Sequence, residues 1–240
     1  MNIREITARS ALTKTGIGGY DYCLNPYVGC GHGCRYCYAA FMKRFTGHSE
    51  PWGDFVDVKA NVADVLRRQL RRIRGGTLLI GTVTDPYQPL EKRYCLTRDC
   101  LTALVPSSLE VHVLTRSPLV VRDTDVLKEL SRVEVGLSIT TNREDVKRVF
   151  EPRAPSIASR VEALKALQSK RLGQVLQRVY HTVGYYKKAL DAAGVTPDAV
   201  SAPDDLKKLP FMTRQDLQNN YPFGLFAVPM SNIVRLHAAS

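Results

Sequence analysis

Residues 25–39 read NPYVGCGHGCRYCYA and contain Cys30, Cys34 and Cys37, half of the six cysteines in the chain. Their spacing is C-x3-C-x2-C, and glycines at positions 29, 31 and 33 alternate with them. Glycine allows the backbone to curl into a tight loop. A disulfide framework does not cluster cysteines in this way, so the loop indicates reduced thiols that bind a metal or take part in catalysis.

The three thiols suit either an iron–sulfur cluster or zinc, because thiolates are soft metal ligands. Structural zinc takes four ligands, and the fourth would have to come from His32, Cys23, His48 or a distant cysteine. Three cysteines around a cubane cluster leave one iron with an open position, which is typical of a catalytic site. The spacing favours the cluster over zinc, and three incidental cysteines remain the third interpretation.

Downstream of the loop, apolar patterns of helical and strand type alternate. The predicted helices are 62–73 (ended by Gly75-Gly76), 96–105, 123–130 and 159–167, and the predicted strands are 77–83, 109–114 and 133–139. Such alternation predicts an α/β fold with a parallel sheet, in which ligands gather at the carboxyl ends of the strands. The informative segments are therefore TDPYQPLE, TRSP and TTNRED. We expect the first twenty residues to be an irregular lead-in.

After residue 167 the alternation stops. Residues 172–190 are predicted to form one amphipathic helix, and prolines at 197, 203, 210, 222 and 229 then divide the chain into short pieces. We therefore predict two domains, 1–167 and 168–240, the second mainly helical and irregular.

Composition and charge narrow the class of protein. Hydrophobic residues make up 44% of the chain, no run reaches the roughly 18 apolar residues that span a bilayer, and MNIREITARS is not a secretory signal. We therefore expect a cytoplasmic protein with no membrane partner. The net charge of +11 favours anionic partners such as nucleic acid, with a solubilising surface as the equal alternative. Arg67, Arg71 and Arg74 would share one helix face, which is more commonly solvated.

The segment NPYVGCGHGCRYCYA resembles the radical S-adenosylmethionine (SAM) enzymes, and in particular the branch related to spore photoproduct lyase. The resemblance covers about residues 20–167. Its further landmarks follow in order: Thr84-Asp85, Thr115-Arg116, Ser138-Ile139-Thr140, Phe150-Glu151-Pro152, Pro155 and Arg160. It implies a truncated, partial (β/α) barrel, a [4Fe–4S] cluster on Cys30, Cys34 and Cys37, and S-adenosyl-L-methionine on the fourth iron.

The resemblance also implies roles for other residues. Arg116 would bind the methionine carboxylate of SAM; the alternative is a surface arginine. Thr84 and Ser138 would bond its amino group or ribose; the alternative is hydroxyls that cap the following helices. Tyr36 would lie near the adenine and Tyr38 would relay hydrogen; packing is the alternative for both.

The resemblance extends to the reaction. It implies lyase-type radical chemistry, with nucleic acid as a candidate substrate and flavodoxin or ferredoxin as the electron donor. In the spore enzyme a hydrogen-donor cysteine precedes the matching aspartate by three positions. Thr82 occupies that position here, which argues against thymine-dimer reversal by that route.

A second resemblance begins near residue 171. RLGQVLQRVYHTVGYYKKALDAAGV and DDLKKLPFMTRQDLQNNYPFGLFAVP are similar to the amino-terminal segment of phenylacetate–coenzyme A ligase. The nucleotide loop of that family is expected just after residues 236–240 (LHAAS), so no ATP-binding residue is carried over. We expect a fusion of two truncated segments. The alternative functions are an inactive or partial ligase fragment and a zinc-binding module.

Overall fold

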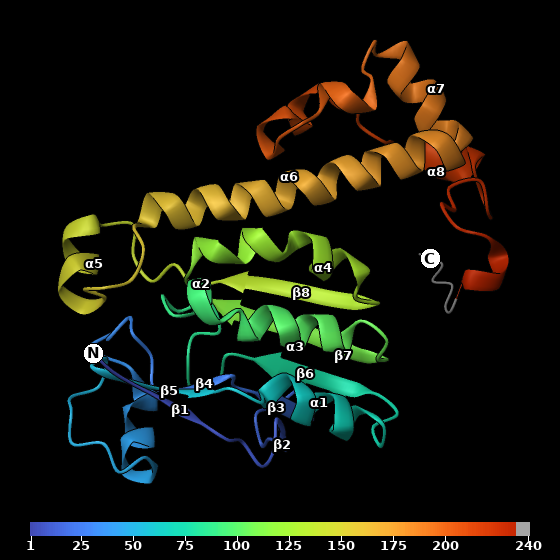
Figure 1. Ribbon diagram of the computed structural model, residues 1–240. Coiled ribbons are helices and arrows are strands. Elements are labelled where there is room, and N and C mark those ends of the chain that lie inside the picture. Colours follow the sequence, from blue (N-terminus) through green and yellow to red (C-terminus); the bar gives the residue numbers. More distant parts are fainter. Residues whose placement is uncertain (234–240) are drawn as a thin grey trace. The chain divides into compact units, whose positions relative to one another are not determined.

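A computed structural model describes residues 1–233 and divides the chain into two compact units, Met1–Leu164 and Lys165–Ser240. The first unit combines strands and helices, and the described part of the second consists of helices and connecting turns (Figure 1). The predicted fold class, α/β with a truncated, partial (β/α) barrel followed by a mainly helical and irregular tail, is confirmed. The predicted 236–240 boundary of the ligase-like segment lies outside the described residues.

The main sheet of the first unit has five strands in the order β2-β3-β6-β7-β8. β2 and β3 are antiparallel, whereas β3–β6, β6–β7 and β7–β8 are parallel. The carboxyl ends of four parallel strands, β3, β6, β7 and β8, therefore lie at the same end of the sheet. Within residues 1–233 the strands do not close into a barrel. The bounds are β2 (Leu12–Lys14), β3 (Tyr22–Leu24), β6 (Gly76–Ile80), β7 (Leu109–Thr115) and β8 (Arg132–Leu137).

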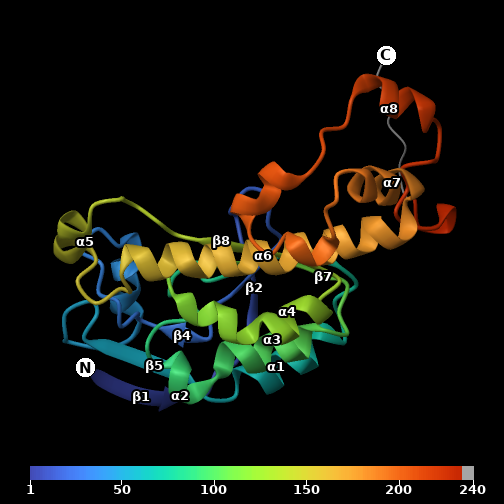
Figure 2. The ribbon, with the colours of Figure 1, turned by 90° about the horizontal axis from the view of Figure 1, so that it is seen from above.

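Helices cover one face of this sheet, as the two views of the ribbon show (Figures 1 and 2). They are α1 (Val62–Leu70), α3 (Leu96–Leu104) and α4 (Thr124–Glu129), with the short α2 (Glu91–Tyr94) before α3. Along β7, Val111 and Val113 are buried, whereas the alternate residues His112 and Leu114 are partly or fully exposed. Because strand side chains alternate between faces, the sheet has one buried face and one open face.

A second, three-stranded sheet contains β1 (Asn2–Ile6), β5 (Phe55–Lys59) and β4 (Tyr27–Val28), in the order β1-β5-β4. The prediction of an irregular lead-in was therefore wrong. The side chains of β1 are almost all exposed, so the strand shows no apolar alternation in the sequence. It is held instead by parallel pairing with β5 and by an ion pair of 2.8 Å between Arg4 and Asp57.

The helices also differ from expectation at two places. The predicted helices 159–167 and 172–190 are instead one helix, α6 (Ile157–Thr182), followed by α7 (Gly184–Ala192). The segment QSKRL favours helix continuation, whereas the backbone of Val183 is extended. α1 ends at Leu70, and Gly76, with φ of +125°, begins β6 rather than capping the helix.

The helices not yet named are short. They are α5 (Glu144–Phe150), α8 (Arg214–Asn219) and the 3₁₀ helices η1 (Tyr38–Phe45), η2 (Pro118–Asp123), η3 (Pro197–Ala199), η4 (Pro203–Lys208) and η5 (Met230–Asn232). None of the helices formed by residues 1–233 is both long enough and apolar enough to cross a membrane.

The two faces of the sheet predict different costs for leucine truncation. Leu78→Ala removes a fully buried side chain from β6 and should lower the free energy of unfolding by roughly 2–5 kcal/mol. Leu114→Ala on β7, where the leucine is 43% exposed, is the matched control and should change it by less than about 1 kcal/mol. Urea unfolding followed by fluorescence of Trp52, which lies in the first unit, measures both. Equal losses would contradict the assignment of the faces.

Candidate functional site

The cysteine loop lies between β4 and η1, at the carboxyl edge of the main sheet. Cys30 and Cys34 are buried and Cys37 is partly exposed. Two turns shape the loop: Gly33 N donates to Cys30 O at 3.2 Å, and Cys37 N donates to Cys34 O at 3.2 Å. Gly29 has φ of +87°, and a Cβ there would lie 2.5 Å from the carbonyl oxygen of Phe55. The loop therefore requires glycine at position 29.

The three cysteines line one cavity of about 170 Å³. Seven of the eight residues that the sequence marks as site candidates line it, and the eighth, Tyr36, contacts Arg116, which lines it. The seven are Cys30, Cys34, Cys37, Tyr38, Thr84, Arg116 and Ser138. Strand-end residues and the cysteine loop thus converge as predicted from the parallel sheet.

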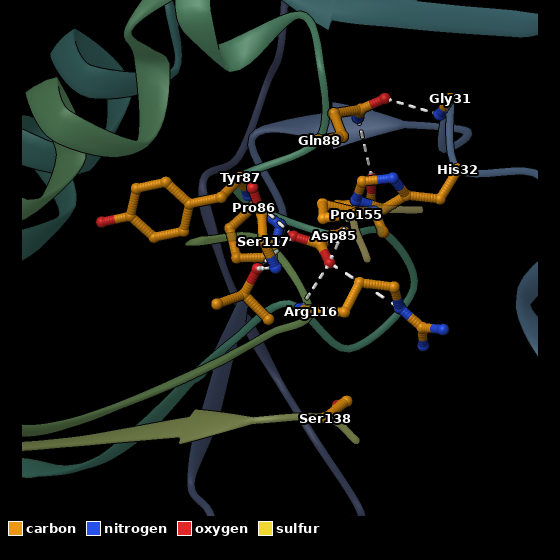
Figure 3. Close-up of polar contacts among 12 residues, drawn as sticks. Gly31, His32, Asp85, Pro86, Tyr87, Gln88, Arg116, Ser117, Ser138 and Pro155 are labelled. Carbon is orange, nitrogen blue, oxygen red and sulfur yellow. Dashed lines mark hydrogen bonds and ion pairs between the residues drawn. The ribbon is translucent and has the colours of Figure 1, made fainter. Parts of the chain in front are cut away.

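Polar residues after β6 anchor the loop (Figure 3). Gln88 accepts a hydrogen bond of 2.8 Å from the backbone N–H of Gly31, and its side-chain amide donates to the Thr84 hydroxyl at 3.1 Å. The Thr84 hydroxyl in turn donates to Gly29 O at 2.6 Å. The structure therefore places Thr84 within the support of the cysteine loop. Gln88 is fully buried, and sequence analysis did not single it out.

Asp85 is the buried carboxylate at the centre of Figure 3. It accepts from the Thr115 hydroxyl at 2.6 Å and from the backbone N–H groups of Arg116 and Tyr87, each at 2.9 Å. Burial alone would raise the pKa of Asp85, but these hydrogen bonds and the neighbouring His32 outweigh it and hold the pKa below its ordinary value. Asp85 thereby fastens the end of β7 to the segment after β6.

His32 points at this carboxylate. Its Nε2 lies 3.4 Å from Asp85 Oδ2, and the ring makes no hydrogen bond of good geometry with any residue in 1–233, so the contact is electrostatic. His48 is bonded to Asp57 at 2.9 Å, and Cys23 lies 3.1 Å from the Thr13 hydroxyl. Two of the candidate fourth zinc ligands, His48 and Cys23, therefore have other partners. Residues 1–233 contain no group of three or more His, Cys, Asp or Glu side chains placed to hold a single ion.

Arg116 is held by a second network, centred on Glu151. Its Nη1 donates to Glu151 Oε1 at 2.7 Å and lies 2.9 Å from the Tyr36 hydroxyl and 3.1 Å from Cys34 Sγ. Glu151 also pairs with Arg160 at 2.5 Å, and both side chains are almost completely buried. Glu151 and Arg160 belong to the FEPRAPSIASR segment, 35 or more residues from Arg116 in sequence. In the sequence they are landmarks of the resemblance and carry no assigned role.

Burial and hydrogen bonding have opposite effects on the pKa of Glu151. Burial raises the pKa of this carboxyl, whereas hydrogen bonds from Tyr36, Arg160 and Thr140 lower it, and the net pKa lies below the ordinary value. For the thiols burial dominates: it raises the pKa of Cys30 to about 12 and that of Cys34 to about 11. Metal binding to these thiols therefore displaces protons.

Ser138 and Tyr38 both line the cavity, but they differ in the hydrogen bonding of their hydroxyls. Ser138 follows β8 directly, its backbone N–H donates to Thr115 O at 2.7 Å, and its hydroxyl has no hydrogen bond within residues 1–233. Tyr38 is 67% exposed and its hydroxyl donates to Thr82 O. The Thr82 hydroxyl accepts from Asn25 at 2.7 Å.

The donor set fits an iron–sulfur cluster. Three soft sulfur ligands face one cavity, and each cysteine of a cubane binds a different iron, so the sulfurs need not converge on a single ion. Besides apolar side chains, the remaining lining supplies hydroxyls, the carboxylate of Asp85 and one guanidinium rather than a fourth thiol. The three thiols therefore fit a cluster in which one iron has no cysteine ligand.

Comparison with known families agrees with this chemistry. Residues 24–188 match the Radical SAM superfamily, and the chain belongs to this class of enzymes. Membership implies a [4Fe–4S] cluster and S-adenosyl-L-methionine as cofactors.

Two known proteins are similar to this chain over part of their length. An uncharacterized protein of Methanocaldococcus jannaschii is 38% identical over 167 residues, which cover 70% of this chain and 62% of that protein. A solved spore photoproduct lyase with bound AdoMet and dinucleoside spore photoproduct matches the fold with a TM-score of 0.53 and 16% identity, covering 67% of this chain and 46% of that one. The chain thus spans less than two thirds of either relative.

The ligase resemblance is also found. Phenylacetate-coenzyme A ligase of Escherichia coli is 48% identical over 86 residues. These residues make up 36% of this chain but only 20% of the ligase. The similarity therefore concerns one segment of that enzyme.

The Glu151 network predicts a pH-dependent stability effect. Glu151→Gln leaves Arg160 without its buried counter-charge and should lower the free energy of unfolding by roughly 3–5 kcal/mol at neutral pH. Because the pKa of Glu151 is lowered on folding, its contribution is present above about pH 4.5 and is lost as the pH falls through the lowered value. The difference between wild type and variant should therefore shrink below that pH, as measured by Trp52-monitored urea unfolding.

Glu129→Gln is the matched control. It replaces the same carboxylate by the same amide, but Glu129 is exposed and has no buried partner among residues 1–233. It should leave stability within about 0.5 kcal/mol of wild type at every pH. A Glu151→Gln variant as stable as this control would show that the network does not support the fold.

Proposed function

We propose that this protein binds a [4Fe–4S] cluster through Cys30, Cys34 and Cys37 and uses SAM for lyase-type radical chemistry on nucleic acid. The observation that carries the proposal is the single cavity that all three cysteines share with Arg116 and Ser138. When bound, the reduced cluster supplies the electron that cleaves SAM into methionine and a 5′-deoxyadenosyl radical. A small redox protein such as flavodoxin or ferredoxin would deliver that electron.

Arg116 is suited to the methionine carboxylate of SAM. Glu151 and Tyr36 fix its Nη1, whereas its Nη2 makes no hydrogen bond within residues 1–233 and its Nε lies 3.9 Å from Asp85. A guanidinium held at one nitrogen presents its remaining donors in a fixed direction, which favours recognition of a carboxylate. The hydroxyl of Ser138 is available for the amino group or ribose, and Thr84 acts through the loop that it anchors.

Burial of the cysteines and polar anchors restricts water at the site. Cys30, Cys34, Thr84 and Asp85 are each less than a tenth exposed. Exclusion of water protects a reactive carbon radical from side reactions. Tyr38, at the exposed side of the cavity, is the residue placed to meet a substrate and to relay hydrogen. Thr82 occupies the position of the donor cysteine of the spore enzyme, which argues against a reaction that ends on a cysteine at that position.

The surface beside the cysteine loop supports nucleic acid as the substrate class. η1 begins at Tyr38, directly after Cys37, and exposes the rings of Phe41 and Phe45. Lys43 and Arg44 lie between these rings and have no carboxylate partner within residues 1–233. Exposed aromatic rings interleaved with cations stack on unpaired bases and attract phosphates.

A separate proposal concerns the origin of the chain. We propose that residues 168–240 derive from the amino-terminal segment of a phenylacetate–coenzyme A ligase joined to a radical SAM domain of residues 1–167. The 86-residue match to the Escherichia coli ligase supports a ligase-like origin of this segment; it is longer than residues 168–240, and the Radical SAM match reaches residue 188, so the two similarities meet within α6 and not at one residue.

The cluster assignment is tested by removing one ligand. Cys34→Ala should lower the iron and sulfide of anaerobically reconstituted protein from about four of each per chain to a small fraction and abolish reductive cleavage of SAM. Cys100→Ala, which removes a buried thiol outside the loop, is the control and should retain both. Iron analysis and detection of 5′-deoxyadenosine measure the outcome. Full iron and SAM cleavage in Cys34→Ala would refute the proposal.

The substrate class is tested by binding of a single-stranded oligonucleotide, measured by fluorescence anisotropy. Phe45→Ala removes a ring that is 73% exposed and should weaken binding by about 1–3 kcal/mol, the contribution of one stacked base. Phe211→Ala, which removes a 97% exposed ring from the second unit, should leave binding unchanged. Equal affinity of the two variants would argue against nucleic acid at this surface.

A further inference from the structure

A second cavity lies at the opposite end of β6 from the cysteines. Its volume is about 430 Å³, and it is formed by the end of α1, the turn that follows, the end of α3 and the loop before β7. Arg67, Arg71 and Arg74 all line it. The strand β6 starts beside this cavity at Gly76 and reaches the cysteine cavity after Ile80. The two cavities therefore lie at opposite ends of the same parallel strands.

The positive charge of this cavity is poorly compensated. Arg67 pairs with Asp64 at 2.7 Å, but both side chains are more than half exposed, so the pair is weak. Arg71 and Arg74 have no carboxylate within ion-pair distance among residues 1–233. Guanidinium groups gathered around one cavity repel each other, and a bound anion relieves that repulsion.

The backbone that carries the arginines is fixed. α1 ends at Leu70, yet Arg71 and Arg74 stay on the cavity because the following turn is closed by hydrogen bonds from Arg72 N to Gln69 O and from Ile73 N to Leu70 O. The Ser108 hydroxyl donates to Arg74 O at 2.6 Å and ties the turn to the loop before β7. A fixed backbone lowers the entropy cost of gathering the side chains on a ligand.

The lining is not only polar. Leu70, Ile73, Ala103 and Pro106 contribute apolar surface beside the arginines. Small-molecule sites combine apolar walls with a few charged groups, and the arginine fork matches phosphate oxygens. The alternative is that the arginines only form a solvated helix face. That role would not require a cavity, nor apolar side chains beside the arginines.

We infer that this cavity binds a phosphorylated ligand of the nucleotide class, with phosphates on Arg71 and Arg74 and the flat apolar part against the wall. The ligand chemistry is a chain of phosphates carrying a base, supplied either by a free nucleotide or by the end of a nucleic acid. Binding requires neither the cluster nor SAM, so the inference stands independently of the proposed function.

The experiment is isothermal titration calorimetry on the full chain, without reconstituted cluster, at physiological ionic strength. The probes are ATP, adenosine and a short single-stranded oligonucleotide. The double variant Arg71→Gln/Arg74→Gln is compared with Arg68→Gln/Arg72→Gln, which makes the same charge change in the same segment at exposed residues that do not line the cavity. Circular dichroism and Trp52-monitored unfolding show whether each variant is folded.

The expected result is that ATP binds to wild type, that adenosine binds at least about ten-fold more weakly, and that the cavity variant loses roughly ten-fold or more in affinity, as expected for lost charged hydrogen bonds. The control variant should stay within about two-fold of wild type. Oligonucleotide binding that is lost only in the cavity variant, with no binding of ATP, would support the site with nucleic acid as the source of the phosphates. Absence of phosphate binding, or equal losses in the two variants, would overturn the inference.

Discussion

The site depends on buried polar contacts that fasten the cysteine loop to the carboxyl ends of the strands. Gln88 and Thr84 bond the backbone of Gly31 and Gly29, and Asp85 bonds the end of β7. Each such bond contributes only about 0.5–1.5 kcal/mol net, but a buried group that loses its partner costs more. These groups are buried together, and the three thiols of the loop that they hold line the same cavity.

The same contacts set the position of Arg116. The backbone N–H of Arg116 bonds Asp85 at 2.9 Å, while its guanidinium bonds Glu151 at 2.7 Å. One residue is thus fixed at both ends, by the segment after β6 and by the segment that precedes α6. Arg160 neutralises the second carboxylate oxygen of Glu151, which allows the carboxylate to remain buried and charged. A site built on strand ends therefore draws its rigidity from a segment far along the chain.

The sequence predicts those parts of the fold that carry a local signal. Helical spacing and short apolar runs predict the core of α1, α3, β6 and β7, and parallel strands require that Thr84, Arg116 and Ser138 meet. The exposed strand β1 carries no such signal, because its pairing with β5 depends on backbone groups 53 residues away. The contacts of His32 with Asp85 and of Glu151 with Arg116 also join residues far apart in the sequence, so no local sequence pattern predicts them. What could be anticipated was the set of residues, and what could not was which of them hold one another.

The two ends of the parallel strands differ in how their charge is arranged, and this difference follows from burial. At the carboxyl end, the ionised groups are shielded from water and each is paired: Asp85 with backbone donors and His32, Glu151 with Arg116 and Arg160. Buried charge must be compensated within the protein, so this end presents soft sulfur and fixed hydrogen-bond donors rather than a strong field. At the amino end, the arginines reach solvent and can remain uncompensated. Under the two proposals above, the exposed end would select its ligand by charge, whereas the buried end would combine the charge of Arg116 with a fixed geometry of donors.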